Sequence, residues 1–220
     1  MRFFDIVFSL AGLILLTPIF VVVIIVLRFT GEGEIFYRQK RKGQFGNEFH
    51  ILKFATMLKN SPNMGSGTIT SKNDPRILPI GRILRKTKIN ELPQLINVLI
   101  GEMSLIGPRP HAERDLVGVD PEILEQVLTL KPGLSGVGSL VFRNEEQILQ
   151  KFEDPRFFYD NELAPYKAQL EIWFFNNRGI KMYFILIFAT LISLFIDQKK
   201  VCEFFLKDLP AVPKNLKGLM

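Results

Sequence analysis

The chain has 220 residues, of which 47% are apolar and 23% are charged. This composition excludes a disordered chain, which has few apolar residues, and a protein with many membrane spans, which has few charges. The single cysteine, Cys202, forms no internal disulfide. Together with only two histidines, His50 and His111, it provides too few ligands for a zinc site. The formal net charge of +6 fits an anionic membrane surface, nucleic acid or a phosphorylated substrate as partner.

Residues 3–27 form an apolar run whose only charged residue is Asp5. A membrane span requires about 20 such residues, so we expect this segment to enter a bilayer. It is not a cleavable signal peptide, because only Arg2 precedes it as a basic residue and no small-residue cleavage pattern follows. Thr17 and Pro18 interrupt the run, and a proline removes a helical hydrogen bond, so a kink is expected there. The pattern leaves open a straight span, oriented by the basic residues that follow, and a kinked helix that turns back within one leaflet.

A second apolar run covers residues 182–196 and is flanked by charged residues. It is too short to span a bilayer comfortably, and the aromatic residues 173–175 precede it. Aromatic side chains favour the headgroup region, so we expect helices that lie at the membrane interface. A buried core helix is the alternative.

The stretch between Arg28 and Lys88 is strongly basic. It contains 13 Lys or Arg residues and four acidic residues, a net charge of +9 that exceeds the charge of the whole chain. Because it follows the apolar run directly, attraction to anionic lipid explains it. No nucleic-acid-binding motif accompanies the charge, which argues against a nucleic-acid partner.

Short β-prone runs at residues 34–39 and 49–54, separated by Gly43 and Gly46, predict a hairpin. A polar loop is expected over residues 61–74, followed by a short basic helix over residues 80–86.

The most informative stretch covers residues 88–110. Asn90 stands where a helix cap belongs, Glu91 and Pro93 fall in the first turn, apolar residues recur at helical spacing, and Gly101 ends the helix. In an anonymous helix, Asn90 and Glu91 serve only as a cap and a partner of the helix dipole. Arg109 stands between two prolines in Gly-Pro-Arg-Pro, a rigid setting that suits either a salt bridge or bidentate binding of phosphate.

Further short motifs occur in a fixed order along the chain: Gln39, Arg41 and Gly43, then residues 53–57, 74–77, 81–82, 91–99, 101–110 and 131–136. Each motif is weak alone, whereas the ordered set is specific. With the interrupted N-terminal helix, it makes the chain resemble the small monotopic phosphoglycosyl transferases over nearly its whole length. These bacterial sugar transferases start the assembly of O-antigen, capsule and exopolysaccharide.

The resemblance implies an α+β fold: a mostly helical domain on the cytoplasmic face with a small β-hairpin, an N-terminal re-entrant membrane helix and interfacial amphipathic helices. We expect the re-entrant helix at residues 1–30, the catalytic domain at 31–179, the interfacial apolar helix at 180–197 and a C-terminal tail at 198–220. The implied reaction transfers a sugar phosphate from a UDP-sugar to undecaprenyl phosphate, releasing UMP, with Mg²⁺ as cofactor. It takes place on the cytoplasmic face of the bacterial inner membrane, in contact with membrane lipid and without nucleic acid.

In this family an Asp-Glu pair opens the helix that is predicted here near residue 90. The aspartate attacks the donor to form a phosphosugar-enzyme, and the glutamate assists and helps to hold the metal. This sequence has Asn90 in place of the aspartate, and Glu91 matches the glutamate. The resemblance assigns catalysis to Asn90 and Glu91, metal binding to Glu91, and substrate phosphate binding to Arg41, Lys53, Arg76, Arg85, Arg109 and Arg143.

An amide is a poor nucleophile and brings no charge to a metal, so Asn90 opens three accounts. Glu91 becomes the nucleophile, the lipid phosphate attacks the donor directly, or the chain is a silent relative that binds UDP-sugar or polyprenyl phosphate as a scaffold. Neighbouring helical residues point about 100° apart, so Glu91 does not take the position of the missing carboxylate. We therefore expect direct attack, with Glu91 organising Mg²⁺, because the acceptor phosphate is already an anion that needs positioning more than activation.

Overall fold

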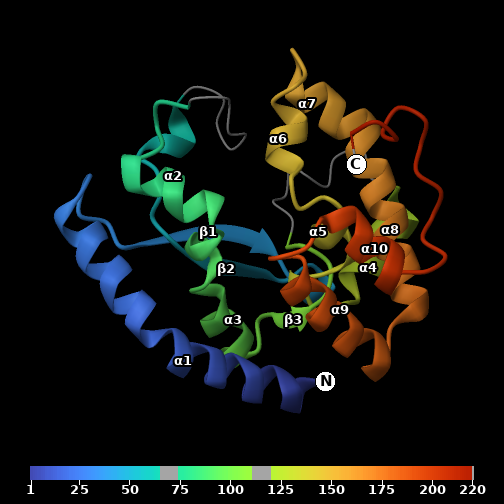
Figure 1. Ribbon diagram of the computed structural model, residues 1–220, viewed down its shortest axis with the longest axis horizontal. Coiled ribbons are helices and arrows are strands. Elements are labelled where there is room, and N and C mark those ends of the chain that lie inside the picture. Colours follow the sequence, from blue (N-terminus) through green and yellow to red (C-terminus); the bar gives the residue numbers. More distant parts are fainter. Residues whose placement is uncertain (65–73, 111–119, 220) are drawn as a thin grey trace. The chain divides into compact units, whose positions relative to one another are not determined.

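The computed structural model describes residues 1–64, 74–110 and 120–219. It confirms the predicted α+β class, since the described residues are mostly helical and their two sheets have two strands each (Figure 1). The strands are β1 (Phe36–Lys42), β2 (Glu48–Phe54), β3 (Ser104–Ile106) and β4 (Gly133–Ser135). The α-helices are α1 (Arg2–Phe29), α2 (Pro79–Lys86), α3 (Gln94–Ile100), α4 (Pro121–Leu128), α5 (Val137–Val141), α6 (Glu145–Leu149), α7 (Pro155–Phe158), α8 (Ala164–Asn177), α9 (Ile180–Ile192) and α10 (Gln198–Phe205).

The chain divides into two compact units. The amino-terminal unit consists of Phe3–Lys40 and His50–Gly101, and the carboxyl-terminal unit of Met1–Arg2, Arg41–Phe49 and Glu102–Met220. The predicted polar loop at residues 61–74 falls mostly outside the described residues, and His111 lies outside them. The predicted basic helix is confirmed as α2.

In the amino-terminal unit, α1 is one continuous helix that passes through Pro18. Pro18 has no backbone N–H, so one helical hydrogen bond is missing at this position. At the residue before it, the Thr17 hydroxyl donates to the Leu13 carbonyl at 2.8 Å. Figure 1 shows that the helix changes direction along its length without ending. The kink predicted at Thr17 and Pro18 is therefore a bend within one continuous helix, because the loss of one hydrogen bond does not end a long apolar helix.

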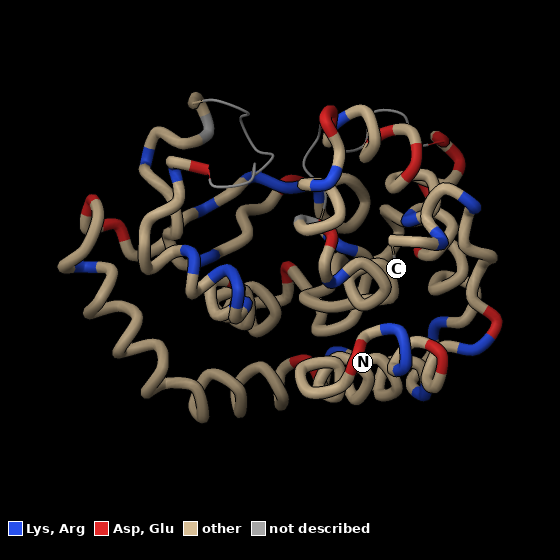
Figure 2. The backbone as a smooth tube through the Cα atoms, turned by 45° about the horizontal axis from the view of Figure 1, so that its top comes forward, with Lys and Arg blue, Asp and Glu red and all other residues tan. Residues whose placement is uncertain are grey.

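The surface of α1 is apolar over most of its length, and Figure 2 shows it as a long helix without charged residues between its first and last turns. At 1.5 Å per residue its 28 residues extend about 42 Å, more than the thickness of a bilayer's hydrocarbon core. Large side chains such as Ile14 and Leu15 are exposed. Among the described residues it is the one helix long and apolar enough to cross a membrane, and it fits a membrane anchor.

The last turns of α1 also build the core of the amino-terminal unit. Val23 and Leu27 are buried together with Phe54 of β2 and Leu84 of α2. The ring of Phe54 lies 5.3 Å from the ring of Phe20, between centroids. This packing joins the membrane-anchoring helix to the strand that carries Lys53.

The predicted hairpin is confirmed as β1 and β2. Its tip is a 3₁₀ turn at Gln44–Gly46, closed by a hydrogen bond of 2.6 Å from the Gly43 N–H to the Asn47 carbonyl. Phe45 has a φ of 57° there, a conformation that costs free energy outside glycine. The strands extend further toward the tip than predicted, because the turn itself needs only these few residues.

Two sequence motifs meet in the carboxyl-terminal unit, where β3 and β4 pair in parallel with Ser104 opposite Gly133. Gly107 donates to the Ser135 carbonyl at 2.9 Å, and Gly133 donates to the Pro108 carbonyl at 2.7 Å. A Cβ atom added at Gly133 would collide with the backbone nitrogen of Gly107. The motifs at residues 101–110 and 131–136 therefore form one packed backbone unit that tolerates no side chain at this glycine.

The helix α9 has a buried face formed by Tyr183, Leu186 and Ala189. Its other side and the turn that follows expose Phe188, Leu191 and Phe195. An exposed apolar surface of this kind fits the predicted interfacial position, which stays a prediction.

Candidate active site

The amino-terminal unit brings together two predicted site residues, Lys53 on β2 and Glu91 in the turn before α3. The Lys53 Nζ lies 3.5 Å from Glu91 Oε1. The two side chains are 16% and 22% exposed, so they are accessible to solvent yet interact in a less polar medium than bulk water. The pair offers one positive and one negative group to a substrate with phosphates and its counter-ion.

Asn90 does not cap a helix. Ile89–Glu91 forms a 3₁₀ turn, α3 begins only at Gln94, and no side chain caps either element. The predicted cap is wrong because the 3₁₀ turn and Pro93 displace the start of α3. Asn90 is instead 7% exposed, and its Oδ1 has no hydrogen-bond partner among the described residues. An unpartnered buried oxygen is costly, so it marks a place where a ligand or an ion is expected.

Asn97 was not among the predicted site residues, although it lies within the motif at residues 91–99. Its side-chain Nδ2 donates to the His50 carbonyl at 2.9 Å, and its Oδ1 accepts from the Leu52 N–H at 3.0 Å. The buried amide thus pairs with β2 as a neighbouring strand would. Because Lys53 follows Leu52, this contact also fixes where Lys53 stands relative to Glu91.

Arg76 was predicted to bind substrate phosphate, and the structure shows that its guanidinium has partners within the protein. Its guanidinium is 3% exposed and makes two hydrogen bonds to the Asp74 carboxylate, at 2.8 and 2.6 Å. The Nη1 group donates to the carbonyls of Ser61 and Met64. Arg76 therefore ties the 3₁₀ turn at Ser61–Asn63 to the segment before α2, and phosphate binding by Arg76 stays a prediction.

Arg85 and Arg41 lie on α2 and β1. Arg85 lies in the last turn of α2. After this helix, Lys88 has a φ of 60° and leads the chain into the Ile89–Glu91 turn. Arg41 lies near the end of β1 and belongs to the carboxyl-terminal unit. Phosphate binding by both residues stays a prediction.

The carboxyl-terminal unit holds Arg109 and Arg143. Arg109 is exposed and follows Gly107, whose backbone is fixed against β4, so the arginine extends from a rigid segment. Arg143 follows α5 and is half-buried. Its Nη1 donates to the Ser193 hydroxyl at the end of α9 at 2.7 Å. The backbone next to Arg109 and the guanidinium of Arg143 are therefore fixed, and both arginines stay candidates for phosphate binding.

The expected Mg²⁺ finds few protein ligands. Across the three described ranges, no group of three or more His, Cys, Asp or Glu residues can hold a metal ion. Magnesium binds oxygen and commonly uses one or two carboxylates together with substrate phosphates and water. The Glu91 carboxylate and the unpartnered Asn90 oxygen fit an ion that substrate phosphates complete, and they do not fit a site built by protein alone.

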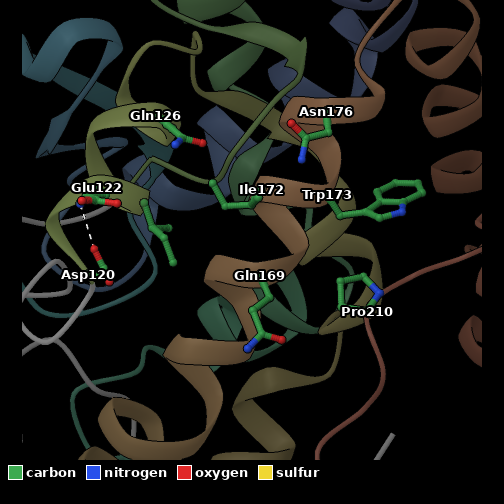
Figure 3. A pocket seen from close by; sticks show the side chains of 9 residues that line it. Asp120, Glu122, Gln126, Gln169, Ile172, Trp173, Asn176 and Pro210 are labelled. Atoms are coloured by element: carbon green, nitrogen blue, oxygen red, sulfur yellow. Dashed lines mark hydrogen bonds between the residues drawn. The ribbon is translucent and has the colours of Figure 1, made fainter.

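A groove lies apart from all predicted site residues, between α4 and α8 in the carboxyl-terminal unit (Figure 3). It has a volume of about 460 Å³. Asp120, at its edge, caps α4 by accepting from the Glu122 N–H at 2.9 Å. The lining has carboxylates and amides and no cation, so it is unsuited to a phosphate; it consists of Asp120, Glu122, Ile123, Gln126, Gln169, Ile172, Trp173, Asn176 and Pro210.

Comparison with known proteins gives a consistent picture. Residues 1–197 match the family model described as bacterial sugar transferase. The exopolysaccharide production protein ExoY of Sinorhizobium fredii is 36% identical over 158 residues, which cover 66% of this chain and 70% of the relative. The exopolysaccharide production protein PSS of Rhizobium leguminosarum bv. phaseoli is 32% identical over 202 residues, or 87% of this chain and 93% of the relative. The UDP-glucose:undecaprenyl-phosphate glucose-1-phosphate transferase of Escherichia coli is 33% identical over 194 residues, or 86% of this chain and 39% of the relative.

The geometry of Arg76 predicts a role in stability. Arg76→Met leaves the buried Asp74 carboxylate without its cation, so we expect the free energy of unfolding to fall by about 3 kcal/mol in denaturant titrations in detergent. Glu34→Gln is the matched control, because it breaks an exposed pair with Lys59 at 2.7 Å, and no measurable change is expected. A stable Arg76→Met protein that has lost affinity for UDP-sugar would return Arg76 to the phosphate site.

Proposed function

The chain belongs to the bacterial sugar transferase family, and we propose that it transfers a sugar phosphate from a UDP-sugar to undecaprenyl phosphate and releases UMP. Membership of this family makes it a phosphoglycosyl transferase. The structural observation that supports the specific reaction is the pairing of Glu91 with Lys53 in a turn where Asn90 holds a buried, unpartnered oxygen. Relatives named as glucose and galactose phosphotransferases make UDP-glucose and UDP-galactose the donors to test first.

The transfer proceeds in one step in this proposal. An oxygen of undecaprenyl phosphate forms a bond to the phosphorus that carries the sugar. The bond between that phosphorus and the bridging oxygen breaks, and UMP leaves with the electron pair. The attacking phosphate is already an anion, so the step needs orientation and charge neutralisation more than a general base. An Asn at position 90 is compatible with this route because no protein nucleophile is required.

Five side chains, three in the amino-terminal unit and two in the carboxyl-terminal unit, supply what the step requires. The Lys53 ammonium neutralises charge on a phosphate, and its position is fixed by the Asn97 contact with β2. Glu91 and the Asn90 oxygen would hold Mg²⁺, which when bound neutralises the diphosphate and the departing UMP. Arg109 and Arg143 are assigned to phosphate binding, for which a guanidinium fork is suited.

The membrane position follows from what the substrates demand. The donor is water-soluble and the acceptor is a lipid, so the active site has to lie at an interface. We place α1 as a re-entrant helix in one leaflet of the inner membrane, with both its ends on the cytoplasmic side. Its bend supports this placement, and so does the packing of Val23 and Leu27 into the core of the amino-terminal unit, which leaves only the earlier turns free to enter the bilayer.

A second candidate function rests on Asn90 itself. A chain without the family carboxylate would still bind UDP-sugar or polyprenyl phosphate, and it would then act as a scaffold without turnover. The buried Asn90 oxygen is equally suited to binding a ligand in this case.

UMP release separates the two functions. The purified protein in detergent is incubated with UDP-glucose or UDP-galactose, Mg²⁺ and undecaprenyl phosphate, and UMP is measured. We expect release that depends on the lipid phosphate, and a loss of about 100-fold or more in Glu91→Gln, because the carboxylate is removed at unchanged size. Glu34→Gln, an exposed carboxylate of the same unit, is the control and should retain activity.

Two outcomes contradict the proposed reaction. Wild-type protein that binds UDP-sugar without releasing UMP would favour the scaffold. Full activity of Glu91→Gln would remove the Lys53–Glu91 pair from the reaction.

The re-entrant placement predicts the labelling of single cysteines. In a chain with Cys202→Ser, the exposed positions Phe3→Cys and Arg38→Cys mark the two ends of the membrane segment. Neither should react with a membrane-impermeant maleimide applied to spheroplasts, and both should react once the membrane is opened. Reaction of Phe3→Cys from outside would establish a complete span.

A further inference from the structure

The segment from Gly138 to Glu145 carries Arg143 and contacts α8 on both sides of that arginine. The Gly138 N–H donates to the Glu171 carboxylate. At the other end, the Lys167 Nζ lies 2.7 Å from Glu145 Oε2. Lys167 and Glu171 are four residues apart on one helix and so lie on the same face. One face of α8 therefore holds the chain before and after Arg143.

An aromatic contact lies between these two polar ones. The ring of Phe142 meets that of Tyr166 edge to face, with centroids 5.9 Å apart and planes at 87°. Phe142 is 3% and Tyr166 is 1% exposed. The Tyr166 hydroxyl donates to the Pro210 carbonyl at 2.9 Å, which fixes the ring that Phe142 packs on. The residue directly before Arg143 is thus held as firmly as the ends of the segment.

The head of Arg143 is oriented by α9. Its Nη1 donates to the Ser193 hydroxyl at 2.7 Å, and that hydroxyl donates to the Thr190 carbonyl at 2.7 Å. The other N–H groups of Arg143 have no protein partner among the described residues. A guanidinium that is held at one corner and keeps its remaining donors is suited to bidentate binding of a phosphate.

The two side chains of α8 that hold this segment, Lys167 and Glu171, form a clamp, and this clamp is costly for stability. Lys167 is 6% and Glu171 is 4% exposed. Burial raises the pKa of Glu171 to about 7, although Lys167 and the Gly138 N–H act to lower it. Burial also acts to lower the pKa of Lys167, but Glu145 and Tyr159 outweigh it and leave that pKa raised. Apolar side chains would cover this face of α8 at lower cost, so the charged pair is better explained by the geometry that it imposes.

Gly138 shows how closely the clamp fits. A Cβ atom added there would lie 2.6 Å from Glu171 Oε1. The carboxylate therefore occupies the space in which any other residue would place its side chain.

We propose that Lys167 and Glu171 are positioning residues that clamp the segment 138–145, so that Arg143 presents its guanidinium to a phosphate group of the substrates. The inference rests on the proposed function, in which the donor is a nucleoside diphosphate sugar and the acceptor is a lipid phosphate. Both ligands carry the phosphate that an arginine fork binds, and the experiment distinguishes them by measuring each one separately.

The test is a double-mutant cycle between α8 and Arg143. Lys167→Met and Glu171→Met each remove one clamp contact, and Arg143→Ala removes the group through which they act. Each clamp variant alone should lower kcat/KM for UMP release about tenfold. Added to Arg143→Ala, the same substitution should lower kcat/KM by less than about twofold relative to Arg143→Ala alone. Asp160→Asn, which breaks the more exposed 2.7 Å pair with Arg156 in the same unit, is the control and should leave kcat/KM unchanged.

Two further measurements do not depend on turnover. Hydrogen exchange over residues 138–145 should be faster in both clamp variants than in the wild type and in Asp160→Asn. Binding of UDP-glucose and binding of undecaprenyl phosphate are titrated separately. Arg143→Ala should weaken the binding of one of these ligands, and the clamp variants should weaken the binding of that same ligand. That ligand carries the phosphate that Arg143 binds. If the wild type binds that ligand without releasing UMP, the proposed function is contradicted, whereas matched weakening of binding in Arg143→Ala and in the clamp variants still supports the clamp.

Additive losses of kcat/KM, unchanged hydrogen exchange, or weakened binding of different ligands in the two sets of variants would overturn the inference. A wild type that binds neither ligand would overturn it together with the proposed function. If Lys167→Met does not fold, because Glu145 and Glu171 lose their cation, Glu171→Met decides the outcome. That variant leaves Lys167 paired with Glu145 and removes only the acceptor of the Gly138 N–H.

Discussion

The hydrogen-bonded contact between the Asn97 amide and the backbone of β2 sets the geometry on which the candidate site depends. A strand and a helix that meet only through apolar side chains can slide relative to each other, whereas a paired donor and acceptor fix one register. This register places Lys53 beside Glu91. The core formed by the last turns of α1 with Phe54 then links the same strand to the membrane anchor. Position relative to the membrane and arrangement of the site are thus consequences of one packed unit.

The charged residues of the chain divide into those that hold the fold and those that remain available to a substrate. Arg76 is enclosed by Asp74 and two carbonyls, and Lys167 is enclosed by Glu145 and the ring of Tyr159. Exposed or half-buried cations, such as Arg109, keep access to solvent. The count of basic residues in the chain therefore overstates the number of cations that a phosphate or a lipid headgroup would meet, because some of them are enclosed inside the protein.

The sequence was informative where local chemistry determines structure. The hairpin, α2 and the end of α3 at Gly101, which has a φ of 95°, follow from strand pattern, helical spacing and the need for a positive φ. It failed where tertiary contacts decide. A helix cap was expected at Asn90, but a 3₁₀ turn buries that residue, and the burial depends on packing that no local pattern contains. The enclosure of Arg76 and the clamp by Lys167 likewise depend on partners distant in the chain, so their residue types alone did not distinguish structural from substrate-binding roles.

The central claim is that Asn90, which stands in place of a nucleophilic aspartate, acts only as an oxygen ligand, and that the lipid phosphate attacks the donor directly. Intact-protein mass spectrometry after incubation with UDP-glucose or UDP-galactose and Mg²⁺, without undecaprenyl phosphate, tests it most directly. The account predicts an unchanged mass for the wild type, and a gain of one sugar phosphate for Asn90→Asp, in which the carboxylate is restored. A sugar phosphate adduct on the wild-type protein, mapped to Glu91 or to any other side chain, would contradict direct transfer.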